Sequence, residues 1–184
     1  LARWIGPYDF GLLGMIAIFI ATGKTLTDSG MTASLIRTKN PDQTDYSTVF
    51  FINLIMSIIV YVFIYFAAPF IADFFGQIIL IEMIRVYCLI FLVIAFSAVH
   101  LAILTKEMNF SKITKINFPS TIIGVSIGLY LGYHGHGVWS IIFMYLSIEL
   151  IKSILLWMFS HWKPQLIFSK IKFKIHYKFG YKLM

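Results

Sequence analysis

Glu149 and Lys152 carry opposite charges inside a long apolar stretch, residues 138–160. Because the two residues are three positions apart, their side chains share one face of an α-helix. Charged side chains inside a membrane usually face a water-filled cavity, where they contact a substrate or an ion. The alternative is a structural pair, in which each charge neutralises the other and the helix packs against its neighbours. We expect the pair to lie in a substrate cavity.

Lys24 and Asp28 form a second pair, four positions apart in the apolar stretch 10–36. Threonine and serine residues surround them, so this half of the stretch is unusually polar. One interpretation is that the pair lines the same kind of cavity. The other is that the chain leaves the apolar environment near Lys24, and that water solvates both charges.

Arg85 and His100 are further candidates at the edge of, or within, the apolar stretch 86–105. The guanidinium group of Arg85 is suited to hold an anionic headgroup or phosphate through paired hydrogen bonds. The structural alternative is an interfacial arginine whose aliphatic stem lies along apolar surface. His100 is suited to titrate near neutral pH, or its ring is simply hydrogen-bonded within a helix bundle.

The sequence contains no pattern of catalytic or metal-binding residues. His134 and His136 flank a glycine, but they lack the third and fourth ligands of a zinc site. A glycine-rich phosphate loop, a helical His-Glu zinc motif and a nucleophilic serine elbow do not occur in the sequence. We therefore expect neither an enzyme nor a metal or cofactor site.

Gly124, Gly128 and Gly132 repeat every four residues in the stretch 116–133. This spacing places all three on one helix face, where the lack of side chains lets a second helix approach closely. Pro119 in the same stretch favours a kink. We expect a helix-packing face that serves either as a static contact or as the sliding surface of a gate.

The composition requires a membrane environment for these residues. Hydrophobic residues make up 59% of the 184 residues, charged residues 12%, and the mean hydropathy is +0.85. Soluble domains contain about 45–50% apolar and about 25% charged residues, so a globule of this composition could not cover its surface with polar groups. The net charge of +7 therefore does not indicate a soluble nucleic-acid-binding protein. A disordered chain and a disulfide scaffold are also excluded.

Five apolar stretches predict an all-α, polytopic membrane helix bundle. A helix crosses the hydrocarbon core with about 17–25 apolar residues, and the stretches lack the alternating pattern of barrel strands. We place the spans at residues 10–36, 48–72, 86–105, 116–133 and 138–160. Residues 1–184 then form one transmembrane unit, in which residues 161–184 are a basic linker leading to a further span.

Basic residues gather in the loops on one side of these spans. Two follow the first span, three follow the third and six lie within residues 163–182, whereas Arg3 and Arg85 belong to the opposite side. Because Lys and Arg favour the cytoplasmic side of a membrane, we place the basic loops in the cytoplasm. This orientation puts Leu1 outside, so we expect an earlier span and a longer protein.

Residues 170–179 alternate lysine with apolar side chains. Alternation suits a β-strand, but the position between two membrane segments favours an interfacial segment. There the basic side chains would face anionic lipid, and the apolar side chains would enter the headgroup boundary. A basic topology signal without lipid binding is a sufficient alternative.

Strings of residues along nearly the whole chain match a known pattern. They are Ile5–Gly14 (IGPYDFGLLG), Asp28–Gly30 with Ala33–Arg37, Asp45–Phe50, Ala68–Ala72, Leu104–Phe110 and Gly137–Trp139. As a set they resemble the Wzx-type oligosaccharide flippases of bacteria, in the multidrug/oligosaccharidyl-lipid/polysaccharide exporter superfamily.

The resemblance implies the N-terminal six-helix lobe of a bundle of about 12–14 helices that works by alternating access. Such proteins move polyprenyl-pyrophosphate-linked oligosaccharides across the bacterial inner membrane in the biosynthesis of lipopolysaccharide and other surface polysaccharides. The implied partners are the lipid-linked oligosaccharide, membrane lipids and other polysaccharide-assembly membrane proteins, but no nucleic acid. The resemblance supplies no motif of substrate-binding residues, so the cavity candidates rest on charge alone.

Two other functions fit parts of the pattern. A drug/cation antiporter of the same fold would favour carboxylates in its cavity, whereas the candidates here mix lysine and arginine with single acids. An integral-membrane glycan polymerase or ligase needs a sizeable external loop with acid and base groups, and the predicted external loops are short.

Overall fold

The protein is a bundle of helices along almost the whole chain. The structure, a computed structural model, describes residues 6–28 and 30–180, and the regular structure of these residues is entirely α-helical. The predicted all-α fold is therefore confirmed. Arg3, Ile5 and Lys182, which the sequence analysis used, lie outside the described residues. The helices are α1 (Pro7–Asp28), α2 (Met31–Arg37), α3 (Gln43–Phe75), α4 (Ile79–Tyr87), α5 (Leu89–Lys106), α6 (Phe110–Tyr133), α7 (Val138–Phe159) and α8 (Lys170–Gly180).

Four helical stretches are long and apolar enough to cross a membrane. Large apolar side chains on α3, such as those of Phe63, Phe66 and Phe70, are exposed on the surface of the bundle. Exposure of so large an apolar surface to water is unfavourable, whereas the acyl chains of lipids can cover it. The chain is therefore a multi-pass membrane protein. Helix α6 is not among the four stretches, so a span at 116–133 stays a prediction. The four are Pro7–Thr27, Gln43–Phe75, Ile79–Lys106 and Val138–Phe159.

Two helices replace the single one expected over residues 10–36. Helix α1 ends at Asp28 and α2 begins at Met31, and Gly30 between them has a φ of 64°. This left-handed conformation interrupts a right-handed helix, and glycine adopts it without a steric penalty. Lys24 therefore lies in the last two turns of α1, next to the break.

Capping side chains extend α3 and α6 beyond the predicted spans. Asp42 and Asp45 form a capping box, in which each carboxylate accepts a hydrogen bond from the other residue's backbone N–H, at 2.8 and 3.0 Å. Asn109 Oδ1 accepts from the backbone N–H of Lys112 at 3.2 Å. Because these side chains satisfy first-turn amides, both helices begin ahead of their apolar stretches.

Two further segments differ from the expected bounds. Helices α4 and α5 form one nearly continuous stretch that begins at Ile79, ahead of the expected span 86–105. The basic tail forms the helix α8, which packs against α2 and α3, and does not adopt the strand that its alternation suggested. The side chains of Phe173 and His176, which pack on these neighbours, are too far from their partners in sequence for a local pattern to reveal the contact.

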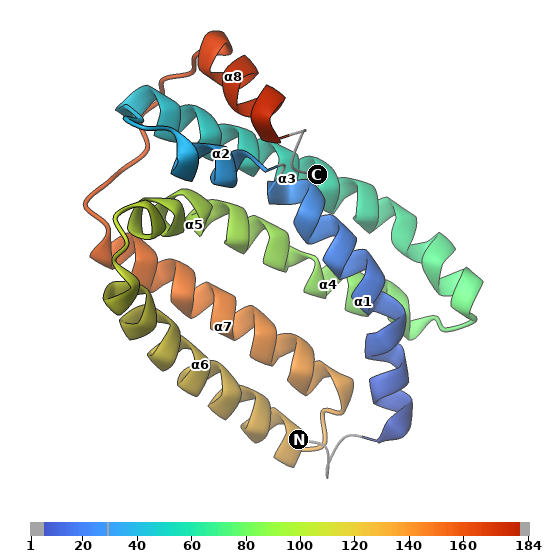
Figure 1. The fold of residues 1–184 in the computed structure, drawn as a ribbon. Helices are drawn as coiled ribbons and strands as arrows, with labels where there is room; N and C mark the ends of the chain where they lie inside the picture. Colours follow the sequence, from blue (N-terminus) through green and yellow to red (C-terminus); the bar gives the residue numbers. More distant parts are fainter. Residues whose placement is uncertain (1–5, 29, 181–184) are drawn as a thin grey trace.

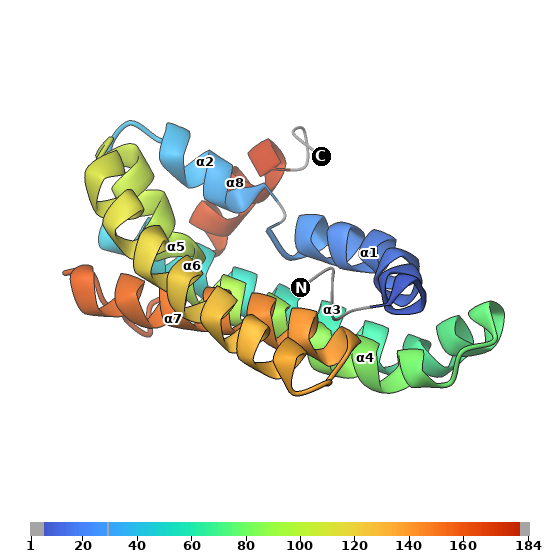
Figure 2. The same ribbon diagram turned by 90° about the horizontal axis from the view of Figure 1, so that it is seen from below.

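The membrane-length helices pack side by side. Helix α6 packs on α7, α5 lies between α3 and α7, and α1 covers α3 and α5 (Figure 1). Figure 2 shows α1, α2 and α8 along one side of this layer. Gly23 allows the close contact of α1, because a Cβ atom there would lie 2.5 Å from Cζ of Phe91 in α5. The hydrophobic core between these helices includes Leu12, Ile16 and Ile142.

One end of the bundle carries the loops after α2, α5 and α7, which hold most of the basic loop residues. We call it the basic end. There the ammonium group of Lys106 donates hydrogen bonds to the carbonyl oxygens of Ile36, at 3.1 Å, and of Thr38, which ties the loop after α5 to the loop after α2. At the opposite end, the hydroxyl of Tyr8 donates to Oε1 of Gln77 at 2.5 Å. Which end faces the cytoplasm follows from charge and stays a prediction.

Candidate functional site

A cavity of about 630 Å³ lies between α1, α2, α3, α5 and α7, and both polar and apolar side chains line it. The cavity is lined by Lys152 of the first predicted pair and by Lys24 of the second, although α7 and α1 are far apart in sequence. The structure thus brings Lys24 together with Glu149 and Lys152. The polar residues of the lining are Lys24, Thr25, Thr27, Thr32, Asn53, Ser97, Glu149 and Lys152.

Positively charged side chains outnumber negatively charged ones in the described lining of the cavity. Nζ of Lys152 lies 3.3 Å from Oε2 of Glu149, and both side chains are about one-fifth exposed. The side chain of Lys24 is exposed, so none of the three charged groups is sealed inside the bundle. Two ammonium groups and one carboxylate therefore line the described cavity. Asp28 ends α1, but its side chain lies outside the part of the structure that is described.

Asn53 is a lining residue that sequence reasoning missed. Its side chain is 1% exposed, and its Nδ2 donates to Oγ1 of Thr32 at 3.3 Å. Among the described residues, no group donates a hydrogen bond to its Oδ1. A buried amide oxygen without a donor is costly. The only signal in the sequence was an amide inside the otherwise uncharged stretch 48–72.

Three hydroxyl groups of the cavity wall donate hydrogen bonds within their own helices. Thr25 and Thr27 donate to the carbonyl oxygens of Ala21 and Gly23, at 3.1 and 2.9 Å. Ser97 likewise donates within α5. Such backbone contacts let threonine and serine face an apolar environment at little cost. The oxygens of Thr25, Thr27 and Ser97 therefore keep lone pairs that can accept a hydrogen bond, while their O–H groups are already paired.

Helices α5 and α7 also border an apolar groove of about 770 Å³, lined by residues of α3, α5 and α7. Phe96, Leu150 and Trp157 line the groove, whereas Ser97, Glu149 and Lys152 line the cavity. Neighbouring residues on the same two helices thus face different surroundings. The indole N–H of Trp157 donates to the carbonyl oxygen of Phe96 at 2.9 Å. This hydrogen bond joins α7 to α5.

Arg85 and His100 do not line the cavity. The guanidinium carbon of Arg85 lies 4.2 Å from the ring centroid of Tyr65, over its face, a cation–π contact. His100 is fully buried in α5, with its ring centroid 4.5 Å from that of Trp157 and 5.2 Å from that of Trp162. Of the six cavity candidates, three therefore share one described site.

The glycine face of α6 lies against α7. A Cβ atom at Gly124 would lie 2.3 Å from Cγ1 of Ile148, and one at Gly128 would lie 2.7 Å from Cβ of Met144. Gly132 is buried on the same helix. Real Cβ atoms do not approach so closely, so the two helices could not keep this distance with side chains at these positions.

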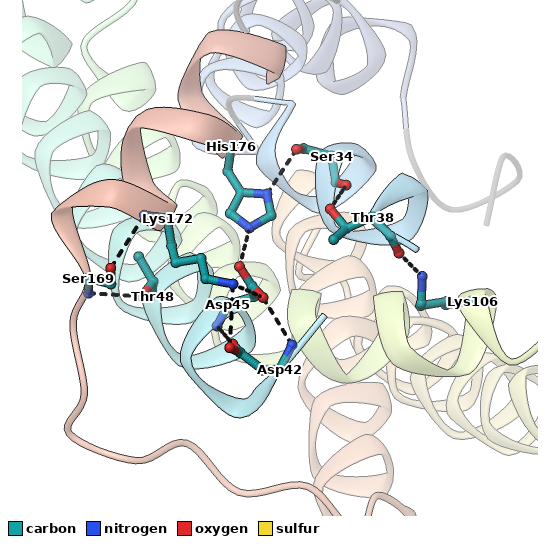
Figure 3. A network of polar contacts seen from close by, with 9 residues as sticks. All are labelled: Ser34, Thr38, Asp42, Asp45, Thr48, Lys106, Ser169, Lys172 and His176. Carbon is teal, nitrogen blue, oxygen red and sulfur yellow. Dashed lines mark hydrogen bonds and ion pairs between the residues drawn. The ribbon is translucent and has the colours of Figure 1, made fainter. Parts of the chain in front are cut away.

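A network of polar contacts at the basic end holds α8 to α2 and α3 (Figure 3). Asp45, which is 2% exposed, accepts from Nζ of Lys172 at 2.8 Å and lies 3.1 Å from Nε2 of His176. Nδ1 of His176 lies 2.9 Å from Oγ of Ser34 in α2. The hydrogen bond with Asp45 raises the pKa of Lys172, because it stabilises the charged ammonium. Sequence reasoning missed this network, because its members come from three separate segments.

The fold and the cavity together define a class: a multi-pass, all-helical membrane protein with a lysine-lined cavity between its helices. The sequence model of the family described as "Polysaccharide biosynthesis protein" matches residues 1–184. The chain belongs to this family.

Curated relatives support the same assignment. The chain is 27% identical to the lipopolysaccharide biosynthesis protein WzxC of Escherichia coli K12, over 98% of the chain and 37% of that protein. It is 23% identical to the teichuronic acid biosynthesis protein TuaB of Bacillus subtilis 168, over 83% of the chain and 32% of that protein. It is 22% identical to the succinoglycan biosynthesis transport protein ExoT of Rhizobium meliloti 1021, over 100% of the chain and 37% of that protein.

The resemblance to Wzx-type proteins is thereby confirmed. The chain spans about a third of the length of these relatives. No solved structure matches the chain significantly.

Proposed function

We propose that the chain is part of an exporter that moves a polyprenyl-pyrophosphate-linked oligosaccharide across the bacterial inner membrane. In this proposal the cavity receives the sugar-pyrophosphate head, and the basic end faces the cytoplasm. The observation that carries the proposal is the convergence of Lys24 and Lys152 on one cavity between membrane helices. The names of the relatives, which concern polysaccharide biosynthesis and transport, agree with it.

The chemistry of the lining suits such a head. A pyrophosphate is an anion, and two ammonium groups provide the positive charge that it needs in a partly desolvated site. Glu149 pairs with Lys152 at 3.3 Å, so the empty cavity does not hold an unpaired buried cation. In this proposal sugar hydroxyls donate to the oxygens of Thr25 and Thr27, and to Oδ1 of Asn53 once this buried side chain turns toward the cavity. The volume of about 630 Å³ lies within the range of small-molecule sites, about 300–1,000 Å³.

Translocation requires the cavity to open to each side of the membrane in turn. We propose that this helical unit rocks as a body against the remainder of the protein, which exposes the cavity alternately to the two sides. No bond of the substrate breaks in this process, so the function needs no catalytic group. A drug/cation antiporter is less well supported, because ammonium groups outnumber carboxylates in the described lining.

The proposal is tested with full-length protein in a bacterial strain that lacks its own exporter. Lys152→Ala and Lys24→Ala should each lower surface polysaccharide while the protein remains in the membrane. A hydrogen bond to a charged group contributes about 1.5–3 kcal/mol, so we expect a loss of about tenfold or more. Lys115→Ala is the matched control, because this exposed lysine lies at the basic end, outside the cavity. Normal polysaccharide export by both cavity variants at normal abundance would contradict the proposal.

A further inference from the structure

We propose that α8 binds anionic phospholipid headgroups through a lysine ladder on its outer face. The lysine ladder consists of Lys170, Lys174 and Lys178, which follow one another at four-residue spacing. Ile171 and Ile175 lie beside them at the same spacing, and all five side chains are exposed and line one shallow groove. Residues at this spacing share one face of a helix. Ammonium groups and apolar side chains thus form parallel rows on the same surface.

Contacts on the other face of α8 fix the direction of the ladder. Lys172 and His176 point into the bundle, where both contact Asp45, at 2.8 and 3.1 Å (Figure 3). The backbone N–H of Ser169, just ahead of α8, donates to Oγ1 of Thr48 at 3.2 Å. Because these contacts hold the start and the middle of the segment to α2 and α3, α8 cannot rotate to hide its lysines. The ladder remains on the surface at the basic end.

The apolar residues of this surface point to lipid as the occupant. Ile171 and Ile175 are 74% and 57% exposed, and Leu166 and Phe168, just before α8, are 95% and 52% exposed. Nothing in the described structure covers them. A polar macromolecule would leave these side chains in water, whereas the boundary between headgroups and acyl chains accepts them. Helix α8 packs on α3, one of the membrane-length helices, so a bilayer surface lies within reach.

The charge of this surface selects anionic lipid. Residues 150–184 contain seven lysines and no Asp or Glu, so no acid on this segment neutralises the ladder. Each lysine near an anionic membrane surface favours binding by about fivefold at physiological ionic strength. Three lysines on one face therefore favour an anionic headgroup over a zwitterionic one by about a hundredfold. This inference concerns the bilayer and does not depend on the substrate of the cavity.

The experiment uses full-length protein with a nitroxide label at position 175. The variant combines Cys88→Ala, which removes the buried native cysteine, with Ile175→Cys. The protein is placed in nanodiscs of phosphatidylcholine alone or of phosphatidylcholine with phosphatidylglycerol. The accessibility of the label to oxygen, which concentrates in lipid, is then compared with its accessibility to a water-soluble nickel chelate. Each measurement is repeated in a triple variant of the ladder, Lys170→Gln, Lys174→Gln and Lys178→Gln.

The matched control removes three other lysines of the basic end, Lys39→Gln, Lys112→Gln and Lys115→Gln. We expect phosphatidylglycerol to raise the ratio of oxygen to nickel accessibility severalfold in the wild-type background and in the control. The ladder variant should lose this response, and inorganic phosphate added to phosphatidylcholine discs should not reproduce it. A response to phosphate would indicate a site for a free anion and contradict lipid binding.

Three other outcomes would also overturn the proposal. The first is an equal ratio in both kinds of disc. The second is low accessibility to both reagents, which would mean that another part of the protein covers the ladder. The third is an equal loss of response in the ladder and control variants, which would assign the effect to total charge rather than to this face of α8.

Discussion

Lys24 near the end of α1 and Lys152 in the second half of α7 line one cavity. The two residues are far apart in sequence, and the packing of α1 over α5 brings them together. Gly23, next to Lys24, permits that packing, because a Cβ atom there would clash with the ring of Phe91. The position of the first ammonium group thus depends on the absence of a side chain at the preceding residue.

The first prediction concerns the unpaired amide oxygen of the cavity. Asn53→Leu keeps the branched shape of the side chain but removes Oδ1, so export of surface polysaccharide should fall while membrane abundance is kept. One hydrogen bond contributes about 0.5–1.5 kcal/mol, which corresponds to a decrease of about two- to tenfold. Ser57→Ala is the control, because this buried residue of α3 bonds within its own helix and does not line the cavity.

Thr32→Val separates the two possible roles of Asn53. It removes the acceptor of the Asn53 Nδ2 hydrogen bond but leaves Oδ1 in place. Export that falls with Asn53→Leu but not with Thr32→Val supports a role of Oδ1 toward the substrate. Equal losses in both variants would show that the amide serves only to join α3 and α2.

The second prediction concerns the contact between α6 and α7. Gly124→Ala should lower the thermal stability of the protein in detergent, because the new Cβ would lie 2.9 Å from the backbone nitrogen of Ile148, which cannot rotate away. Overpacking of this kind costs about 1–3 kcal/mol. Gly14→Ala in α1 meets no atom within 4 Å and should be neutral or stabilising, because alanine favours a helix over glycine. Equal melting temperatures for the two variants would refute the close contact.

The third prediction concerns the attachment of α8. Asp45→Asn removes the carboxylate that contacts both Lys172 and His176, so α8 should detach and trypsin should cleave after Lys170 severalfold faster. Asp42→Asn should have little effect, because Asp42 is 57% exposed and lies 3.4 Å from Lys172, and because asparagine also caps helices well. Unchanged cleavage in Asp45→Asn would show that the other contacts of α8, such as those of His176 with Ser34 and of Ser169 with Thr48, suffice to hold it.

The same contact predicts a dependence on alkaline pH. The pKa of Lys172 is raised by Asp45, so its contribution to the attachment is complete below the pKa of an unfolded lysine, about 10.4. It is lost as the pH rises through the higher pKa of the folded state. The mobility of a nitroxide at position 175 should therefore stay constant from neutral pH to about pH 10 and increase above it. Lys172→Arg should abolish this increase, because arginine stays charged.

Part of this molecule could be predicted from sequence, because the relevant signals are local. Composition and apolar length predicted helices within a membrane, and the spacing of Glu149 and Lys152 predicted their contact on one face of α7. The break at Gly30 was not predictable from hydropathy, because it depends on a backbone conformation. The roles of Asn53 and Asp45 were not predictable either, because each acts on residues of another helix.

The fourth prediction concerns the orientation of the chain. In a Cys88→Ala background, a membrane-impermeant maleimide added to sealed cells should label His134→Cys, an exposed position at the end of α6. It should not label Asn40→Cys, an exposed position at the basic end, until the cells are permeabilised. The basic loops favour the cytoplasm, and labelling of position 40 in sealed cells would reverse the orientation.

The central claim is that the lysines of the cavity bind the head of a lipid-linked oligosaccharide while the protein moves it across the membrane. The most direct measurement reconstitutes the full-length protein in liposomes with a fluorescent polyprenyl-pyrophosphate oligosaccharide and follows the appearance of the sugar in the opposite leaflet. The wild-type protein should translocate the sugar, whereas Lys24→Ala/Lys152→Ala should do so at least about tenfold more slowly, and Lys112→Ala/Lys115→Ala should match the wild type. Equal rates for the wild type and the cavity double variant would contradict the account.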